Sequence, residues 1–120
     1  MSVSITGPVW TDVTNGTNVD DNHATDTYLG QASVHGGKVH LRGALKLSGA
    51  LTSTILCTLP ASHRPSAEVR VPIAWYDDSA TGHLVTVAKV ATTGVVTLPG
   101  PSATPAANDI FFLDGISFDL

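Results

Sequence analysis

Alternation of apolar and polar residues with a period of two is the feature that most limits what this chain can fold into. Residues 39–47 and 69–75 each place their large apolar side chains on a single parity. This pattern is typical of a strand with one buried and one exposed face. Gly43 lies on the apolar parity of the first run, which predicts a bend or the close approach of another backbone. Pro72 has no N–H to donate, which predicts an edge strand or a nearby bulge.

The composition indicates the same class of fold. The sequence has 13 Val, 5 Ile and 15 Thr against one Glu, one Gln, one Met and three Lys, so β-branched residues replace the straight-chain helix formers. Pairs such as Asn15-Gly16 and Thr93-Gly94 supply turns between short apolar runs. Further strands are expected at residues 9–13, 27–33, 84–90, 95–98 and 110–120. The predicted fold is an all-β, antiparallel β-sandwich, jelly-roll-like, with seven to eight short strands.

The length of 120 residues fits one such domain. We expect residues 1–8 to be an N-terminal lead-in or linker and residues 9–120 to be the sandwich domain. The first eight residues have neither a basic segment nor a long apolar one, so no secretory signal is predicted. Cys57, the single cysteine, lies in an alternating run and is expected to be a buried core residue.

The charges argue against several classes of partner. The net charge is −4, and the six Lys and Arg residues are spread along the chain, whereas nucleic-acid binding requires a dense basic footprint. The apolar stretches fall well short of the roughly 20 residues that span a bilayer, so no membrane insertion is expected. No motif for catalysis or for a cofactor is present, and Glu68 is the single Glu. We therefore predict a protein without enzymatic activity and without a cofactor.

The metal-ligating residues form no complete set in the sequence. His35 and His40 stand on either side of Gly36-Gly37, a spacing that brings two imidazoles together in a hairpin, but no third ligand stands at a matching distance. Surface histidines without a metal are the favoured interpretation. An ion held on the axis of a symmetric trimer by His40 or His35 is the alternative. Residues 20–26 lack the Gly and one ligand of a calcium loop, which favours a solvated loop.

Aromatic and acidic residues lie side by side at the end of one predicted strand. Trp75 and Tyr76 precede Asp77 and Asp78, which combines flat apolar rings with hydrogen-bond acceptors suited to a sugar. Tyr76 has the outward parity and is the better surface candidate. Trp75 shares the parity of the inward residues, so a core position competes with ligand binding, and the core is also favoured for Trp10.

The C-terminal segment, residues 110–120, holds all three Phe of the chain and is apolar on both parities. A strand that is apolar on both faces requires a cover on both faces. A loop or a second copy of the chain could provide the second cover, and we favour self-association. The predicted interface residues are Phe111, Phe112 and Leu113.

Three blocks of sequence, in this order, carry a family resemblance: Val39-His40-Leu41-Arg42-Gly43, Leu59-Pro60-Ala61 with Arg64-Pro65, and Leu113-Asp114-Gly115-Ile116-Ser117-Phe118. With weaker matches between them, the sequence from Trp10 to Phe118 resembles the C-terminal domains of tail-fibre and minor tail proteins of phages that infect actinobacteria. The resemblance implies a trimeric β-sandwich head at the tip of a fibre on the virion, with residues 1–8 leading in from the fibre shaft. It implies attachment to a host surface, often a glycan, or a cap that locks the trimer.

The resemblance also directs attention to single residues. His63 stands where an aromatic is expected in the second block, and it completes the set of candidate ligand-binding residues. Arg42 projects from the polar face of its strand, where it could pair with Asp114 or Asp119 within a chain or between copies, and it joins the predicted interface. The family offers no catalytic residues. A polysaccharide-processing domain, the remaining alternative, would draw on these carboxylates: Asp77, Asp78, Asp109 and Asp114.

Overall fold

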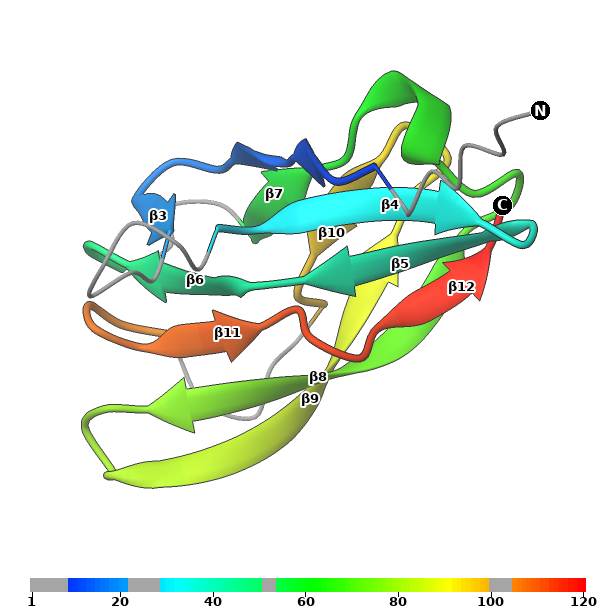
Figure 1. The fold of residues 1–120 in the computed structure, drawn as a ribbon. Coiled ribbons are helices and arrows are strands. Elements are labelled where there is room, and N and C mark those ends of the chain that lie inside the picture. Colours follow the sequence, from blue (N-terminus) through cyan, green and yellow to red (C-terminus); the bar gives the residue numbers. More distant parts are fainter. Residues whose placement is uncertain (1–8, 22–28, 51–53, 100–104) are drawn as a thin grey trace, which may run out of the picture.

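The alternating runs form strands that pair antiparallel in two sheets, as the computed structural model shows for residues 9–21, 29–50, 54–99 and 105–120 (Figure 1). The four-stranded sheet has the order β1 (Thr11–Asp12), β4 (Gln31–His35), β5 (Lys38–Arg42), β12 (Ser117–Asp119). The eight-stranded sheet has the order β2 (Thr14–Asn15), β7 (Ile55–Thr58), β10 (Val95–Thr97), β9 (Gly82–Val90), β8 (Val69–Asp77), β11 (Ile110–Phe112), β6 (Ala44–Leu47), β3 (Val19–Asp21). The predicted all-β, antiparallel sandwich is confirmed.

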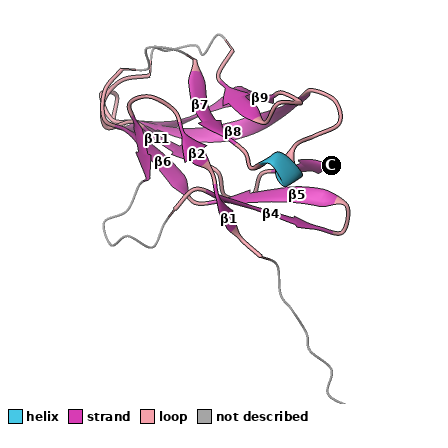
Figure 2. Ribbon diagram, turned by 90° about the horizontal axis from the view of Figure 1, so that it is seen from above, coloured by secondary structure: helices cyan, strands magenta, loops and turns pink. Residues whose placement is uncertain are grey.

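The view from above shows the two layers (Figure 2), and the short 3-10 helix η1 (Ala61–His63) lies against β4. No helix in the described part of the chain is long and apolar enough to cross a membrane. The expected lead-in at residues 1–8, most of the loop at residues 20–26 and the start of the strand expected at residues 27–33 lie outside the described residues.

The described residues contain twelve strands, more than the seven to eight predicted, partly because two predicted strands each divide between the sheets. Residues 39–47 leave the four-stranded sheet after β5 and enter the eight-stranded sheet as β6, and the change occurs at Gly43, with φ +97°. A Cβ on Gly43 would lie 1.9 Å from the carbonyl oxygen of Leu29. The bend and the close backbone approach predicted for Gly43 are both present.

The C-terminal segment makes the same transition in the opposite direction. β11 pairs with β6 in one sheet and β12 pairs with β5 in the other, so the two segments form a ribbon that bends across both layers. Hydrogen bonds hold the ribbon at the bend: the Leu113 amide donates to the Gly43 carbonyl oxygen at 2.8 Å, and the Gly43 amide donates to an Asp114 carboxylate oxygen at 2.8 Å. Gly115, with φ +80°, completes the turn.

This bend covers most of the apolar side chains of the C-terminal segment without a second copy of the chain. Phe111 and Leu113 point inward from one sheet, and Phe118 points inward from the other, because the turn at Asp114 and Gly115 reverses the parity of the buried positions. Phe111, Leu113 and Phe118 are therefore covered within a single chain, whereas Phe112 is half-buried.

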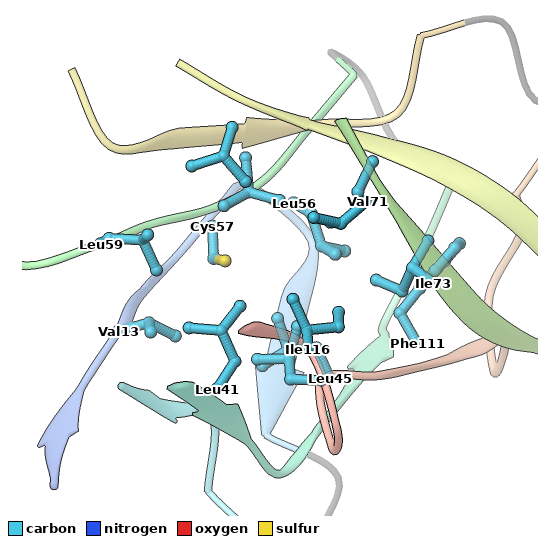
Figure 3. Packing of buried hydrophobic residues seen from close by; sticks show 14 of the residues in the cluster. Val13, Leu41, Leu45, Leu56, Cys57, Leu59, Val71, Ile73, Phe111 and Ile116 are labelled. Atoms are coloured by element: carbon cyan, nitrogen blue, oxygen red, sulfur yellow. The ribbon is translucent and has the colours of Figure 1, made fainter. Parts of the chain in front are cut away.

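The core lies between the sheets, where side chains from both layers meet (Figure 3). β8 alternates as predicted and contributes Val71, Ile73 and Trp75, of which Trp75 is fully buried against Phe111 with ring centroids 5.3 Å apart. Cys57 is also fully buried, as expected, and burial raises the pKa of its thiol to about 12.

Pro72 lies inside the eight-stranded sheet, since β8 runs between β9 and β11, so the predicted edge strand is wrong. Its position is still open on one side. The pairing of β8 with β11 ends where Ala74 lies opposite Phe112, and Ala74 is two residues after Pro72 in the sequence. A residue without an N–H is tolerated here because no residue of β11 stands opposite to accept from it.

Candidate functional site

Three aromatic side chains gather on the outer face of the eight-stranded sheet. The register places Tyr76 of β8 directly opposite His83 of β9, with ring centroids 5.1 Å apart. The ring of Phe112 in β11 lies 6.3 Å from that of His83. Tyr76 and Phe112 are half-buried and His83 is exposed. We call Tyr76, His83 and Phe112 the aromatic cluster.

A groove of about 460 Å³ begins beside Phe112, where β11 leaves β8 and crosses to the other sheet. Its apolar walls include Pro72, Ala74 and Val85, and its polar lining comes from Asp114 and Ser117. The volume is within the range of small-molecule sites, and a mainly apolar lining with a few polar groups is typical of them.

Apolar side chains continue along the outer face of β8 and β9. Val85 is 72% exposed and Val87 is 44% exposed, and their register partners Ala74 and Pro72 are exposed beside them. We call Pro72, Ala74, Val85 and Val87 the apolar strip. It adjoins the aromatic cluster, so one face of the sheet carries both features.

The ligand residues predicted around the turn between β8 and β9 have different roles in the structure. One Asp77 carboxylate oxygen accepts from the Ser79 amide at 3.1 Å, the Ser79 hydroxyl at 2.7 Å and the Ala80 amide at 3.3 Å. Asp77 is thus buried and holds the turn. Asp78 is exposed one residue further on, near Tyr76, while Trp75 points into the core.

Two predicted ligand residues are therefore misplaced for surface binding. Trp75 is buried, because its parity on β8 is that of the core residues, and the competing core interpretation is correct. His63 is buried in η1, and its ring nitrogen Nδ1 lies 2.8 Å from the Ser62 hydroxyl oxygen. η1 precedes the opposite end of β8 from Tyr76, so the fold does not bring these residues together (Figure 1).

The carboxylates that a polysaccharide-cleaving site would need are also engaged in the fold. Asp109 is 1% exposed, and its carboxylate accepts from the amides of Asp78 at 3.0 Å and Ala106 at 2.9 Å. Asp77 holds its own turn, and Asp114 accepts from the Gly43 amide. Of the four carboxylates named from the sequence, Asp78 is the one with no hydrogen bond to its carboxylate in the described residues.

The outer face of the four-stranded sheet carries a second polar and aromatic group that sequence reasoning missed. The Arg42 guanidinium lies 4.0 Å from the centroid of the Trp10 ring and donates twice to the Gln31 side-chain oxygen, at 3.0 and 2.7 Å. The Gln31 amide donates to Asp12 at 2.8 Å. The outward parity of Arg42 was the available signal, but nothing in the sequence placed Trp10 above it.

The predicted pairing of Arg42 with Asp114 or Asp119 is absent within the chain. The bend of the ribbon engages Asp114 with the Gly43 amide, and Asp119 lies 2.8 Å from the Lys38 ammonium. The hydrogen bond and the positive charge of Lys38 lower the pKa of the exposed Asp119 carboxyl from its usual 3.8.

The predicted interface residues are likewise divided. Phe111 and Leu113 are fully buried in the single chain and have no side-chain surface for a second copy. Phe112 reaches the outer face as part of the aromatic cluster, and Arg42 is exposed on the other sheet.

Solved structures of phage proteins share this fold. The head domain of lactococcal phage bIL170, described among receptor-binding domains, matches with a TM-score of 0.65 and 17% identity over 95% of this chain and 99% of that chain. The receptor-binding protein gp15 of Listeria phage PSA matches with a TM-score of 0.64 and 15% identity over 93% of this chain and 64% of that chain. No family model and no curated protein sequence matches the chain. The chain therefore has the fold of this head domain and of about two thirds of gp15.

Proposed function

We propose that this chain is the head domain of a phage receptor-binding protein, carried on the virion tail, which attaches to the host cell surface without catalysis. The fold that it shares with two receptor-binding domains over nearly its whole length is the observation that carries the proposal. The sequence resemblance adds a finer proposal, a tail fibre of a phage that infects actinobacteria. The structural neighbours belong to lactococcal and Listeria phages, so they support the class of function and not that host.

The proposed receptor is a surface glycan bound at Tyr76 and His83 of the aromatic cluster, beside the apolar strip and not on it. Tyr76 and His83 offer ring faces for the apolar side of a sugar, and the exposed Asp78 offers an acceptor for hydroxyl groups. A few polar groups beside an apolar surface are the arrangement that fixes the orientation of a small ligand.

The proposed assembly is a homotrimer packed through the apolar strip. Val85 and Val87 expose branched apolar side chains on adjacent positions of one strand face, and burial of such surface contributes about 25 cal/mol per Å². Phe112 lies on the same outer face, so it is the one phenylalanine of the predicted interface that can take part. A structural cap that registers three fibre chains without contacting a receptor is the competing proposal, and it shares this trimer.

Binding to a glycan array and to intact host cells tests the receptor proposal. We expect Tyr76→Ala to abolish binding by the labelled domain and Asp78→Ala to weaken it. Trp10→Ala is the matched control, because Trp10 is a half-buried aromatic on the other sheet. Loss of binding with Trp10→Ala alone would move the receptor site to the four-stranded sheet, and a domain that binds no glycan and no host cell would favour the cap.

Mass measurement in solution at micromolar concentration tests the trimer. We expect a trimer for the wild-type chain and a monomer for Val85→Asp combined with Val87→Asp. Val9→Asp is the control, since Val9 is likewise exposed, at 69%, but lies outside the apolar strip. A wild-type monomer would overturn the trimer and, with it, the cap.

A further inference from the structure

Two imidazoles lie face to face at the end of the β4–β5 hairpin. His35 of β4 and His40 of β5 have ring centroids 3.9 Å apart and an interplanar angle of 10°. We propose that His35 and His40 form a two-nitrogen binding site for a divalent ion of the late first transition row, with Cu²⁺ bound most tightly. Both ligands come from one chain, so the site needs no symmetry axis and does not depend on the proposed receptor function.

The sequence sets this arrangement through the turn. Gly36 and Gly37 have φ +63° and +75°, the positive values that a two-residue turn between antiparallel strands requires. The turn fixes the register of His35 opposite Lys38, and His40 lies two residues further along β5 on the same face. Residues that are diagonal neighbours on one face of a strand pair are within reach of long side chains. The two imidazoles therefore meet without any rearrangement of the backbone.

The two rings lie close enough for both imidazoles to reach one metal ion. Metal–nitrogen bonds to imidazole are about 2.0–2.1 Å long, which places two nitrogens in neighbouring coordination positions about 2.9–3.4 Å apart. Each metal–nitrogen bond lies in the plane of its own imidazole, so the stacked rings, with centroids 3.9 Å apart, must turn about their side-chain torsions until both planes meet at the ion. The exposed position of His35 leaves room for water at the remaining coordination positions.

The ring nitrogens are available as ligands. Within the described residues, no hydrogen bond is made by either the His35 or the His40 ring. The one cation between them in the register, Lys38, is hydrogen-bonded to Asp119 of β12, on the side of β5 away from β4. That carboxylate balances the ammonium charge, which reduces its repulsion of a bound cation.

A buried hydroxyl on the same face of the hairpin is a second sign of an incomplete polar site. Ser33 lies directly opposite His40 in the register and on the same face as His35. Its hydroxyl oxygen is buried and has no hydrogen-bond partner among the described residues. Buried polar groups in native proteins are nearly always paired, so an ordered ligand or water at this place would satisfy Ser33.

The donor set determines the class of ion. Among the described residues, no group of three or more His, Cys, Asp or Glu stands together, so the protein supplies two imidazoles and solvent supplies the rest. Imidazole suits Cu²⁺, Ni²⁺ and Zn²⁺, and the affinity of a given nitrogen site rises from Ni²⁺ to Cu²⁺ and falls again at Zn²⁺. The hard ions Mg²⁺ and Ca²⁺ prefer oxygen ligands and are not expected to bind.

Titration of the chelator-treated, untagged protein with CuCl₂, NiCl₂, ZnCl₂ and CaCl₂ by calorimetry tests the proposal. We expect one Cu²⁺ per chain at this site, weaker Ni²⁺ and Zn²⁺, and no Ca²⁺. At a free concentration one hundred times the Kd, the ion should raise the Tm by up to about 10 °C, because it binds the folded hairpin in preference to the unfolded chain. The electron paramagnetic resonance spectrum of the copper form should show coupling to two imidazole nitrogens.

Single variants separate a two-nitrogen site from adventitious binding to lone histidines. We expect His35→Ala and His40→Ala each to weaken Cu²⁺ binding at least about tenfold, because losing one nitrogen removes the advantage of two linked ligands. His83→Ala is the matched control, since His83 is an exposed histidine paired with a Tyr ring on the other sheet. Copper binding that survives His35→Ala or His40→Ala at full strength, or that is lost equally in His83→Ala, would overturn the proposal.

Discussion

Replacing Gly43 with alanine should destabilise the protein far more than the same replacement at another glycine with positive φ. Gly43 has φ +97°, and a residue with a Cβ in such a conformation costs about 1–3 kcal/mol. The added Cβ would also lie 1.9 Å from the Leu29 carbonyl oxygen and 2.5 Å from its carbon, both of which belong to the backbone. Strain and displacement of that backbone together predict a loss of about 4 kcal/mol.

The loss converts directly into a shift of the melting temperature. An unfolding entropy of about 2.1 cal/mol/K per residue gives about 0.25 kcal/mol/K for 120 residues, so Gly43→Ala should lower the Tm by about 16 °C. Thermal melts followed by circular dichroism, at equal protein concentration for each variant, provide the measurement. Urea titrations of the same samples give the free energy of unfolding independently.

Gly36→Ala is the matched control for Gly43→Ala. Gly36 also has positive φ, +63°, but a Cβ there would meet nothing within 4 Å. This variant should lose only the conformational term, about 1 kcal/mol, or about 4 °C in Tm. The reasoning about the backbone crossing is refuted if the Tm of Gly43→Ala is no lower than that of Gly36→Ala.

Three further predictions concern single groups. Asp109→Ala should cost about 2–4 kcal/mol of stability in urea titrations, because it removes a buried carboxylate that accepts from two backbone amides, and an unchanged midpoint would contradict that role. Lys38→Met should raise the pKa of Asp119 toward 3.8, as measured in a carboxyl titration followed by NMR. Because the pKa of Asp119 is lower in the folded than in the unfolded protein, the small stabilisation by this pair is present above about pH 4. It is lost as the pH falls through the folded pKa. Cys57 should be inert to a thiol reagent at pH 8 until denaturant is added, because burial raises its pKa to about 12, and rapid labelling of the native protein would show that the core is open.

The bent ribbon shows how far local patterns predict this fold. The alternation of residues 39–47 and the glycine at its centre predicted a strand and a bend, and both are present. The pattern could not show that residues 39–42 and 44–47 belong to different sheets. Alternation determines which side chains of a strand are buried, but not which sheet the strand joins or which residues pack against it. The same gap led to the wrong prediction that Phe111 and Leu113 face a second copy.

The candidate sites were predicted unevenly for the same reason. Parity correctly separated Tyr76, on the surface, from Trp75, in the core. The partners of Tyr76 are His83 across the β8–β9 pair and Phe112 from β11, and only strand pairing brings these three together.

By itself, the sequence determined what depends on neighbours along the chain: an all-β class, the parity of each strand, the turn at Gly36-Gly37 and the meeting of His35 with His40 across it. The tertiary structure alone decided what depends on residues far apart in the chain. It placed the Asp109 carboxylate where it accepts from the backbone amides of two loops, and it left Val85 exposed on the outer face of a sheet. The physical reason is that turn geometry acts over a few residues, whereas burial and strand pairing depend on the segment that packs alongside.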